Sequence, residues 1–224
     1  MTNDILSDLN RRIDHSLLTQ EAGTTAIVRL CREAAEYQFH AICVNPIWVS
    51  KAASTLNGTD IAVASVTGFP LGANRTDIKL AEALKAVDDG ATEIDMVANI
   101  GRIADNDFTY VLREIETIRD ALPFHIVLKV IIEVSKLSKP QLNSVTEAVI
   151  DSGAQFIKTS TGFFGGVTVE QVKAIRAITG NRIKIKASGG IRTPEDCRNL
   201  IAAGADRLGT SASVIIMQEL ATGR

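Results

Sequence analysis

Cysteine and histidine are scarce in this sequence of 224 residues, with three of each. The cysteines are Cys31, Cys43 and Cys197. Their odd number and wide spacing favour a reducing, cytoplasmic setting over a disulfide framework. The histidines are His15, His40 and His125. They are scattered without the spacing of metal ligands, so we expect no metal site.

An excess of charge of one sign is also missing. The 24 basic and 26 acidic residues leave a formal net charge of -2, which gives no general attraction to nucleic acid or to membranes. No apolar run approaches the roughly 18 residues that a membrane-spanning helix needs. The N-terminal stretch MTNDILSDLN is acidic and polar, whereas a secretory signal begins basic and continues apolar. We therefore expect a cytoplasmic protein that binds neither nucleic acid nor membranes.

Apolar residues, in contrast, make up 46% of the sequence and occur in short runs separated by helical patterns. The runs are rich in Ile and Val, as expected of strands buried on both faces. They are RIDHS (12–16), AICVN (41–45), IAVASV (61–66), EIDMV (93–97), HIVLKVII (125–132), FIKTS (156–160), IKIKAS (183–188) and RLGT (207–210). After a short entry helix at 3–10, the helical patterns lie near 20–37, 46–56, 75–89, 106–121, 139–151, 168–179, 194–203 and 211–221.

This alternation of strands and helices predicts an α/β fold, a (β/α)8 TIM barrel that residues 1–224 form as a single domain. Helix signals agree with the pattern, since Thr168 and Gln171 can form a capping box and Thr193 with Pro194 is typical of a helix start. A doubly wound sheet is less favoured, because neither a G-x-G-x-x-G fingerprint nor a P-loop is present.

Three glycines end helical patterns immediately before an apolar run. They are Gly90, Gly153 and Gly204, and five residues after them stand Asp95, Lys158 and Gly209. An equal offset from equivalent glycines predicts an equal height on three parallel strands. Barrel enzymes hold their sites at the C-terminal ends of strands, so we predict an active site there. The other strand ends offer Asp14, Asn45, Thr67, Lys129, Glu133 and Lys186.

Two lysines at the ends of adjacent strands are the most unusual feature of this candidate site. If Lys158 and Lys186 both point inward, like charge and desolvation would lower their pKa values and free a nucleophilic amine near neutral pH. The alternative is that they are barrel lysines paired with Asp95 or Glu133. Asp95 could move protons or only neutralise a lysine. The sequence does not decide whether Lys184 also points inward.

Glycine runs follow the last two predicted strands. Gly189 and Gly190 precede one helix start, and Gly209 and Ser211 precede another. The loops after strands 7 and 8 of such barrels frequently bind phosphate through backbone N–H groups and helix N-termini. Tight turns alone could also explain each glycine run, but two runs in these two loops favour a phosphate site.

With these residues identified, the sequence resembles the deoxyribose-phosphate aldolase family over nearly its whole length. The motifs that carry the resemblance are IDHSLL, AICVNPIWV, VTGFPLGAN, GATEIDMVANIG, LKVIIE, FIKTSTGF, IKASGGIRT and RLGTS, in family order. The resemblance implies a Schiff base on Lys158 of KTSTG, with Asp95 of EIDMV and Lys186 of KASGG as proton donors and acceptors. It also implies a homodimer and no metal or organic cofactor.

The implied activity is reversible cleavage of the sugar phosphate 2-deoxyribose 5-phosphate into acetaldehyde and glyceraldehyde 3-phosphate. The residues predicted to bind the sugar or its phosphate are Asp14, Thr161, Gly162, Gly189, Gly190, Arg192, Gly209 and Ser211. Two departures from the family pattern lie on the phosphate side: Ala212 replaces a common second serine, and Phe163 stands where some members have lysine. The alternatives are an aldolase with another acceptor aldehyde and a non-catalytic barrel that binds sugar phosphates.

Overall fold

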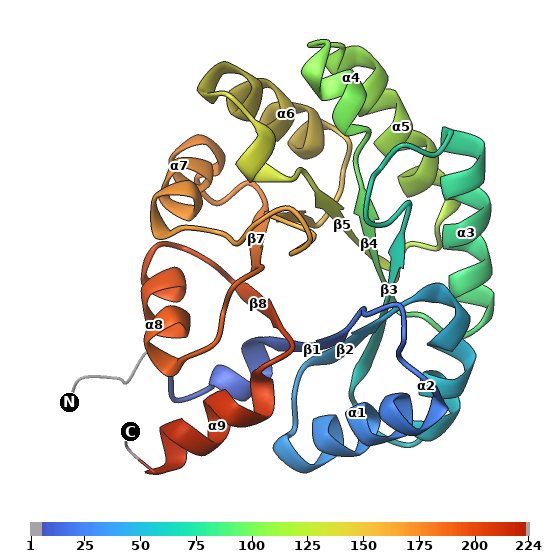
Figure 1. Ribbon diagram of the computed structural model, residues 1–224. Coiled ribbons are helices and arrows are strands. Elements are labelled where there is room, and N and C mark those ends of the chain that lie inside the picture. Colours follow the sequence, from blue (N-terminus) through green and yellow to red (C-terminus); the bar gives the residue numbers. More distant parts are fainter. Residues whose placement is uncertain (1–5, 223–224) are drawn as a thin grey trace.

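The computed structural model describes residues 6–222 and contains a closed barrel of parallel strands in sequential order, surrounded by helices (Figure 1). The strands are β1 (Ile13–Leu17), β2 (Ala41–Val44), β3 (Ala62–Thr67), β4 (Glu93–Val97), β5 (Val127–Ile131), β6 (Phe156–Lys158), β7 (Lys184–Ser188) and β8 (Arg207–Thr210). The α-helices are α1 (Thr24–Tyr37), α2 (Val49–Thr55), α3 (Thr76–Asp88), α4 (Ile100–Ala104), α5 (Phe108–Ala121), α6 (Lys139–Asp151), α7 (Val169–Thr179), α8 (Pro194–Ala202) and α9 (Ser213–Thr222). The predicted (β/α)8 barrel is confirmed.

The helix ends show where the sequence pattern was informative. The capping box of Thr168 with Gln171 is present, and Thr193 caps the helix that begins at Pro194. Helix α4 was not predicted, because its five residues are too few to show a helical period. None of the helices within residues 6–222 combines the length and hydropathy needed to cross a membrane.

The entry helix predicted at 3–10 is wrong in extent. Residues 3–5 lie outside the described residues, and the helix that the structure contains is a 3-10 helix, η1 (Leu9–Arg12). It leads directly into β1, and its Leu9 is buried in the main core. The chain therefore enters the barrel through a short 3-10 turn rather than an α-helix.

The stagger of the strands explains why equal offsets along the sequence give equal heights in the barrel. Asp95 pairs with Lys129, which pairs with Phe156, two residues before Lys158. The register thus shifts by one residue per strand, as expected of an eight-stranded barrel with a shear number of about eight. The step from Lys158 to Gly209 is the same. The tilt of the strands therefore brings these three residues level.

Alternation along the strands separates an apolar layer from a charged interior. The strand residues that pack into the main core beneath the helices are exemplified by Ile42, Ile94, Leu128, Ile157, Ile185 and Leu208, all fully buried. Burying side chains of this kind stabilises the fold by about 1.5–3 kcal/mol each. The barrel interior holds a small apolar cluster, Cys43, Ala64 and Val66, together with Phe156, beside many polar and charged groups. The outer layer therefore holds the barrel together while the interior is available for chemistry.

A buried ion pair between two outer helices fixes the loop after β4. Lys79 of α3 donates to Glu114 Oε1 of α5 and to the Val97 carbonyl, both at 2.9 Å, and Glu114 Oε2 accepts from the Asn99 backbone N–H at 3.0 Å. Both side chains are fully buried. Burial lowers the pKa of Lys79 and raises that of Glu114, in each case against the attraction of the partner. The pair fixes the backbone immediately after the strand that carries Asp95.

We expect Lys79→Met to lower the free energy of unfolding by about 3–5 kcal/mol, because it leaves the Glu114 carboxylate buried without its cation. The double variant Lys79→Met/Glu114→Gln should recover part of this loss. The matched control is Lys85→Met on the same helix, whose side chain is 67% exposed and whose loss should cost less than about 1 kcal/mol. Urea unfolding followed by circular dichroism measures all three, and equal losses for Lys79→Met and Lys85→Met would contradict the role of the pair.

Candidate active site

The carboxylate of Asp95 contacts three lysines inside the barrel. Its Oδ2 accepts from Lys158 Nζ at 2.8 Å and from Lys186 Nζ at 2.7 Å, and its Oδ1 accepts from Lys129 Nζ at 2.6 Å. Burial alone would raise the pKa of Asp95, but the three ammonium groups outweigh burial and hold the pKa well below its usual range. Asp95 is therefore an anion throughout the neutral pH range.

Lys186 is a charged member of this cluster at neutral pH. It is fully buried and donates to both Asp95 and Asp14. Burial would lower its pKa, but Asp14 and Asp95 together outweigh burial and raise the pKa above its ordinary value. The lowered pKa expected for Lys186 from the crowding of two lysines is therefore wrong, because two carboxylates accompany it. Its pairing with Asp95 fits the alternative interpretation.

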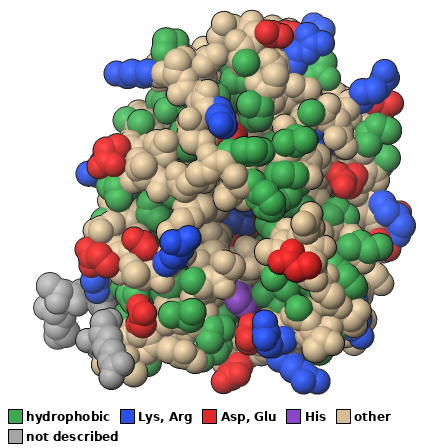
Figure 2. Space-filling view, in the orientation of Figure 1, with side chains coloured by type: hydrophobic (Ala, Val, Ile, Leu, Met, Phe, Trp, Pro, Cys, Tyr) green, Lys and Arg blue, Asp and Glu red, His purple; other side chains and the backbone are tan. Residues whose placement is uncertain are grey.

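Lys158 is the lysine of the cluster that reaches the active-site cavity. This cavity of about 720 Å³ lies at the C-terminal ends of the strands, and Lys158 lines it while Lys129 and Lys186 do not. Figure 2, viewed along the barrel, shows a hollow near the centre with atoms of basic side chains in its floor. A small molecule in this cavity could meet the Lys158 amine directly, with Asp95 behind it.

The cavity walls contain nearly all of the residues predicted to bind the sugar or its phosphate. These are Thr161, Gly162, Gly189, Gly190, Arg192, Gly209 and Ser211. The cavity thus lies against the residues that precede helices α8 and α9, where helix N-termini favour an anion.

Asp14 is the exception among the predicted binding residues. It is fully buried, does not line the cavity, and accepts from Lys186 and, at 2.8 Å, from Arg207 Nη1. Its position near a strand end suggested contact with the substrate, but its side chain lies in the charged interior of the barrel. Asp14 therefore acts on the site through Lys186.

The glycines around the cavity also allow two loops to approach closely. Gly189 has φ +91, and a Cβ on it would lie 3.0 Å from the Gly165 carbonyl oxygen. Conversely, a Cβ on Gly166 would lie 2.9 Å from the Gly189 carbonyl oxygen. The loops after β6 and β7 thus pack backbone against backbone. The positive φ of Gly189 fits the interpretation of the glycines as tight turns, and their use as a phosphate site stays a prediction.

Glu133 holds the loop after β6 beside Lys158. Its Oε2 accepts from the Thr161 backbone N–H at 3.1 Å and from Thr161 Oγ1 at 2.5 Å, and only 2% of the residue is exposed. Its backbone is left-handed, with φ 49 and ψ 62, a conformation that costs energy in a non-glycine residue. The suggested pairing of the site lysines with Glu133 is therefore wrong, since its carboxylate binds Thr161.

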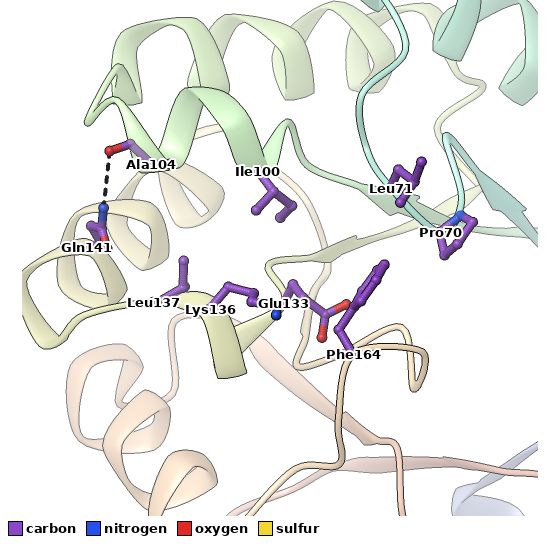
Figure 3. Close-up of a pocket in the computed structure, with 9 residues that line it drawn as sticks. All are labelled: Pro70, Leu71, Ile100, Ala104, Glu133, Lys136, Leu137, Gln141 and Phe164. Atoms are coloured by element: carbon purple, nitrogen blue, oxygen red, sulfur yellow. Dashed lines mark hydrogen bonds between the residues drawn. The ribbon is translucent and has the colours of Figure 1, made fainter.

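A second cavity of about 300 Å³ lies on the other side of Glu133 (Figure 3). Figure 3 shows Glu133 between Lys136 and Phe164, with Pro70 and Leu71 across the cavity. Ser135 Oγ, from the same turn as Glu133, donates to the Phe164 carbonyl at 3.1 Å. The turn after β5 therefore contacts the β6 loop at two points, Thr161 and Phe164, one on each side of Gly162.

Three charged residues of the interior were not assigned roles from the sequence. Lys129 appeared only as a strand-end candidate, and Glu93 and Arg207 were not considered. The available signal was a charged residue at an inward-facing position of an Ile- and Val-rich run. Lys184, left undecided, is exposed, and its Nζ lies 5.6 Å from the centroid of the inward-facing Phe156 ring. It thus shares the inward face with Lys186, outside the ion-paired cluster.

Within residues 6–222, no three His, Cys, Asp or Glu side chains are grouped so that they could hold a metal ion. Cys43 lies beside the cluster, with its Sγ 3.8 Å from Asp95 Oδ2. Burial and the neighbouring Asp95 raise the pKa of this thiol, so Cys43 belongs to the small apolar cluster of the barrel interior as a neutral thiol and not as a thiolate.

We expect Glu133→Ala to release Thr161 and to mobilise the loop that follows Lys158. The amide of Thr161 should lose its hydrogen-exchange protection, because its acceptor is gone. Glu133→Gln is the matched control, since an amide oxygen can still accept from the Thr161 N–H and should preserve protection. Hydrogen exchange measured residue by residue tests this expectation. An unchanged exchange rate of the Thr161 amide in Glu133→Ala would show that Glu133 does not hold the loop.

Comparisons with known proteins find relatives over nearly the whole chain. Residues 8–215 match the family described as DeoC/LacD family aldolase. The deoxyribose-phosphate aldolase of Mycoplasma mobile is 48% identical over 211 residues, which cover 94% of this chain and 97% of that protein. The deoxyribose-phosphate aldolase of Thermoanaerobacter sp. is 46% identical, with coverages of 95% and 96%. The tetrameric deoxyribose phosphate aldolase of Aeropyrum pernix matches with a TM-score of 0.91 at 30% identity, over 100% of both chains.

Proposed function

Because the chain belongs to the DeoC/LacD family of aldolases, we propose that it reversibly cleaves 2-deoxy-D-ribose 5-phosphate into acetaldehyde and D-glyceraldehyde 3-phosphate. One observation carries the proposal: Lys158, held by Asp95, lines a cavity whose walls also contain the glycine loops after β6, β7 and β8. A lysine amine that meets bound small molecules is the group that a Schiff-base aldolase needs.

Lys158 acts as the nucleophile in this proposal. Its neutral amine attacks the aldehyde carbon of the open-chain sugar, and the resulting carbinolamine loses water to give an iminium ion. The bond between carbons 2 and 3 then breaks, its electron pair forms the enamine, and the proton of the carbon 3 hydroxyl leaves. Glyceraldehyde 3-phosphate departs. Protonation of the enamine at carbon 2 and hydrolysis of the iminium release acetaldehyde and restore the amine.

Asp95 and Lys186 move the protons. Lys158 and Lys186 both donate to the same oxygen of Asp95, so the carboxylate can pass a proton between the two amines. Lys186, kept charged by Asp14 and Asp95, is the proton source for dehydration of the carbinolamine. Asp95, kept anionic, accepts protons and stabilises the iminium ion next to it.

The phosphate binds at the loops that precede α8 and α9. Gly189, Gly190 and Gly209 provide bare backbone, and the Arg192 and Ser211 side chains line the same cavity. Thr161 and Gly162 complete the wall next to Lys158. Binding the phosphate away from the reacting bond orients the sugar over the amine.

We further propose that a single barrel domain works as a homodimer in the cytoplasm. Assembly is supported by the tetrameric relative from Aeropyrum pernix and by exposed apolar side chains such as Ile47, which is 79% exposed. A reducing compartment is supported by three cysteines that are all buried and unpaired.

We expect acetaldehyde and borohydride to leave a stable ethyl group on Lys158, because reduction traps the iminium ion. Peptide mapping by mass spectrometry should find the label there and not on Lys129 or Lys186, and Lys158→Met should remain unlabelled. Cleavage of 2-deoxyribose 5-phosphate, followed by coupled reduction of the triose phosphate, should be lost in the same variant. A label on Lys186, or on none of the three, would overturn the assignment.

We expect the phosphorylated sugar to be preferred over free 2-deoxyribose, by a smaller margin than in relatives with two serines and a lysine at this site. Ala212 and Phe163 each remove a donor to a charged group, worth about 1.5–3 kcal/mol, or roughly one to two powers of ten in affinity. Ala212→Ser should widen the margin, mainly through KM. Comparing kcat/KM for the two sugars tests this, and no preference in the unaltered enzyme would refute the phosphate site.

A further inference from the structure

Beneath Asp95, a second ion pair continues the charged interior toward the N-terminal ends of the strands. Lys129 Nζ lies 2.5 Å from Glu93 Oε2 and 2.6 Å from Asp95 Oδ1. Lys129 is fully buried, and the Glu93 side chain is 5% exposed. Neither residue lines the active-site cavity, so neither touches a bound substrate. The mechanism proposed above does not use them.

The charges of the interior do not balance. Three carboxylates face four cationic side chains, and these seven residues are Asp14, Glu93, Asp95, Lys129, Lys158, Lys186 and Arg207. With every group ionised, the cluster carries one positive charge in excess. A net charge in a desolvated interior is unfavourable, so the cluster favours the loss of one proton.

The contacts indicate which amine loses that proton. Lys129 contacts Glu93 and Asp95 and lies 3.9 Å from Asp14, while Lys186 contacts Asp14 and Asp95. Lys158 contacts Asp95 alone and shares the accepting oxygen with Lys186. Lys158 is thus the ammonium with the least negative charge around it.

Glu133, just after β5, is buried, but its carboxylate accepts from the Thr161 N–H and Oγ1 and forms no ion pair with a lysine of the cluster within the described residues. The remaining ionisable groups near the cluster do not change the charge count either. His40, immediately before β2, lies 3.3 Å from Glu93 through Nε2, and Cys43 of β2 is a neutral thiol at neutral pH. Lys184 of β7 is exposed and stacks on Phe156. Burial would lower the pKa of Lys129, but Asp95 and Glu93 outweigh burial and raise it, so Lys129 stays charged.

We propose that Lys129 is a positioning residue whose buried ammonium occupies Asp95 Oδ1 and offsets the charge of Glu93, so that the excess positive charge of the interior favours the neutral, nucleophilic form of Lys158. Glu93 keeps that ammonium in place beneath Asp95. The two residues form a nearly neutral unit, so the single excess charge of the interior falls on Lys158. The inference rests on the proposed function, because it concerns the amine that forms the Schiff base.

Variants that remove one charge or both test the proposal through the pH dependence of kcat/KM, which reports the free enzyme. Lys129→Met leaves no excess positive charge, so Lys158 should keep its proton longer. The acid limb of the profile should move to higher pH by roughly one to two units, and kcat/KM at neutral pH should fall about ten- to hundred-fold. Glu93→Gln adds excess positive charge, so its acid limb should move to lower pH.

The double variant Lys129→Met/Glu93→Gln restores the single excess positive charge of the interior, so its acid limb should return close to that of the unaltered enzyme. A merely structural role would predict damage that accumulates in the double variant. Lys184→Met is the matched control, because it also removes an inward-facing lysine charge but outside the ion-paired cluster. Its profile should not move.

The proposal is overturned if the acid limbs of the Lys129→Met and Glu93→Gln profiles move in the same direction, or if neither moves. If Lys129→Met does not fold because Glu93 is left buried and unpaired, Glu93→Gln and the double variant still decide by the direction and the return of the shift. The proposed function is judged separately, by cleavage activity and by the label on Lys158 in the unaltered enzyme. Those results stand whatever the profiles of the variants show.

Discussion

One carboxylate shared by three lysine side chains is the interaction on which this structure depends. Asp95 is fully buried, and leaving it without cations in that interior would cost several kcal/mol. The barrel brings the cations to it from three neighbouring strands, β5, β6 and β7, because the stagger moves the register by one residue per strand. The same contacts that make the buried charge tolerable therefore assemble the groups that the aldolase chemistry needs.

The apolar layer of the barrel offsets the energetic cost of the buried charges in its interior. The apolar layer beneath the helices stabilises the fold, and the ion pair of Lys79 with Glu114 anchors the loop after β4. Above the charged floor, glycine loops form the cavity wall, and Glu133 holds one of them next to Lys158. Buried charge below and bare backbone above are suited to a fixed reaction centre with a separate site for an anion.

Much of this could be predicted from the sequence where a local signal had a direct structural meaning. The helix-ending glycines located Asp95 and Lys158 at one height, since glycine offset and strand tilt are regular features of such barrels. The charged partners could not be predicted in the same way. Whether Asp14 meets substrate or Lys186, and whether the pKa of Lys186 rises or falls, depends on which inward side chains face each other across the barrel. Strand sequences alone do not contain that information.

The central claim is that the buried charges leave Lys158 as the amine that gives up its proton. The most direct test is a pH titration of the lysine side chains by nitrogen-15 NMR, with signals assigned through Lys129→Met, Lys158→Met and Lys186→Met. The account predicts that, as the pH rises, the Lys158 signal is the first of the three to report loss of a proton, while Lys129 and Lys186 remain charged. Loss of the proton from Lys129 or Lys186 before Lys158 would contradict it.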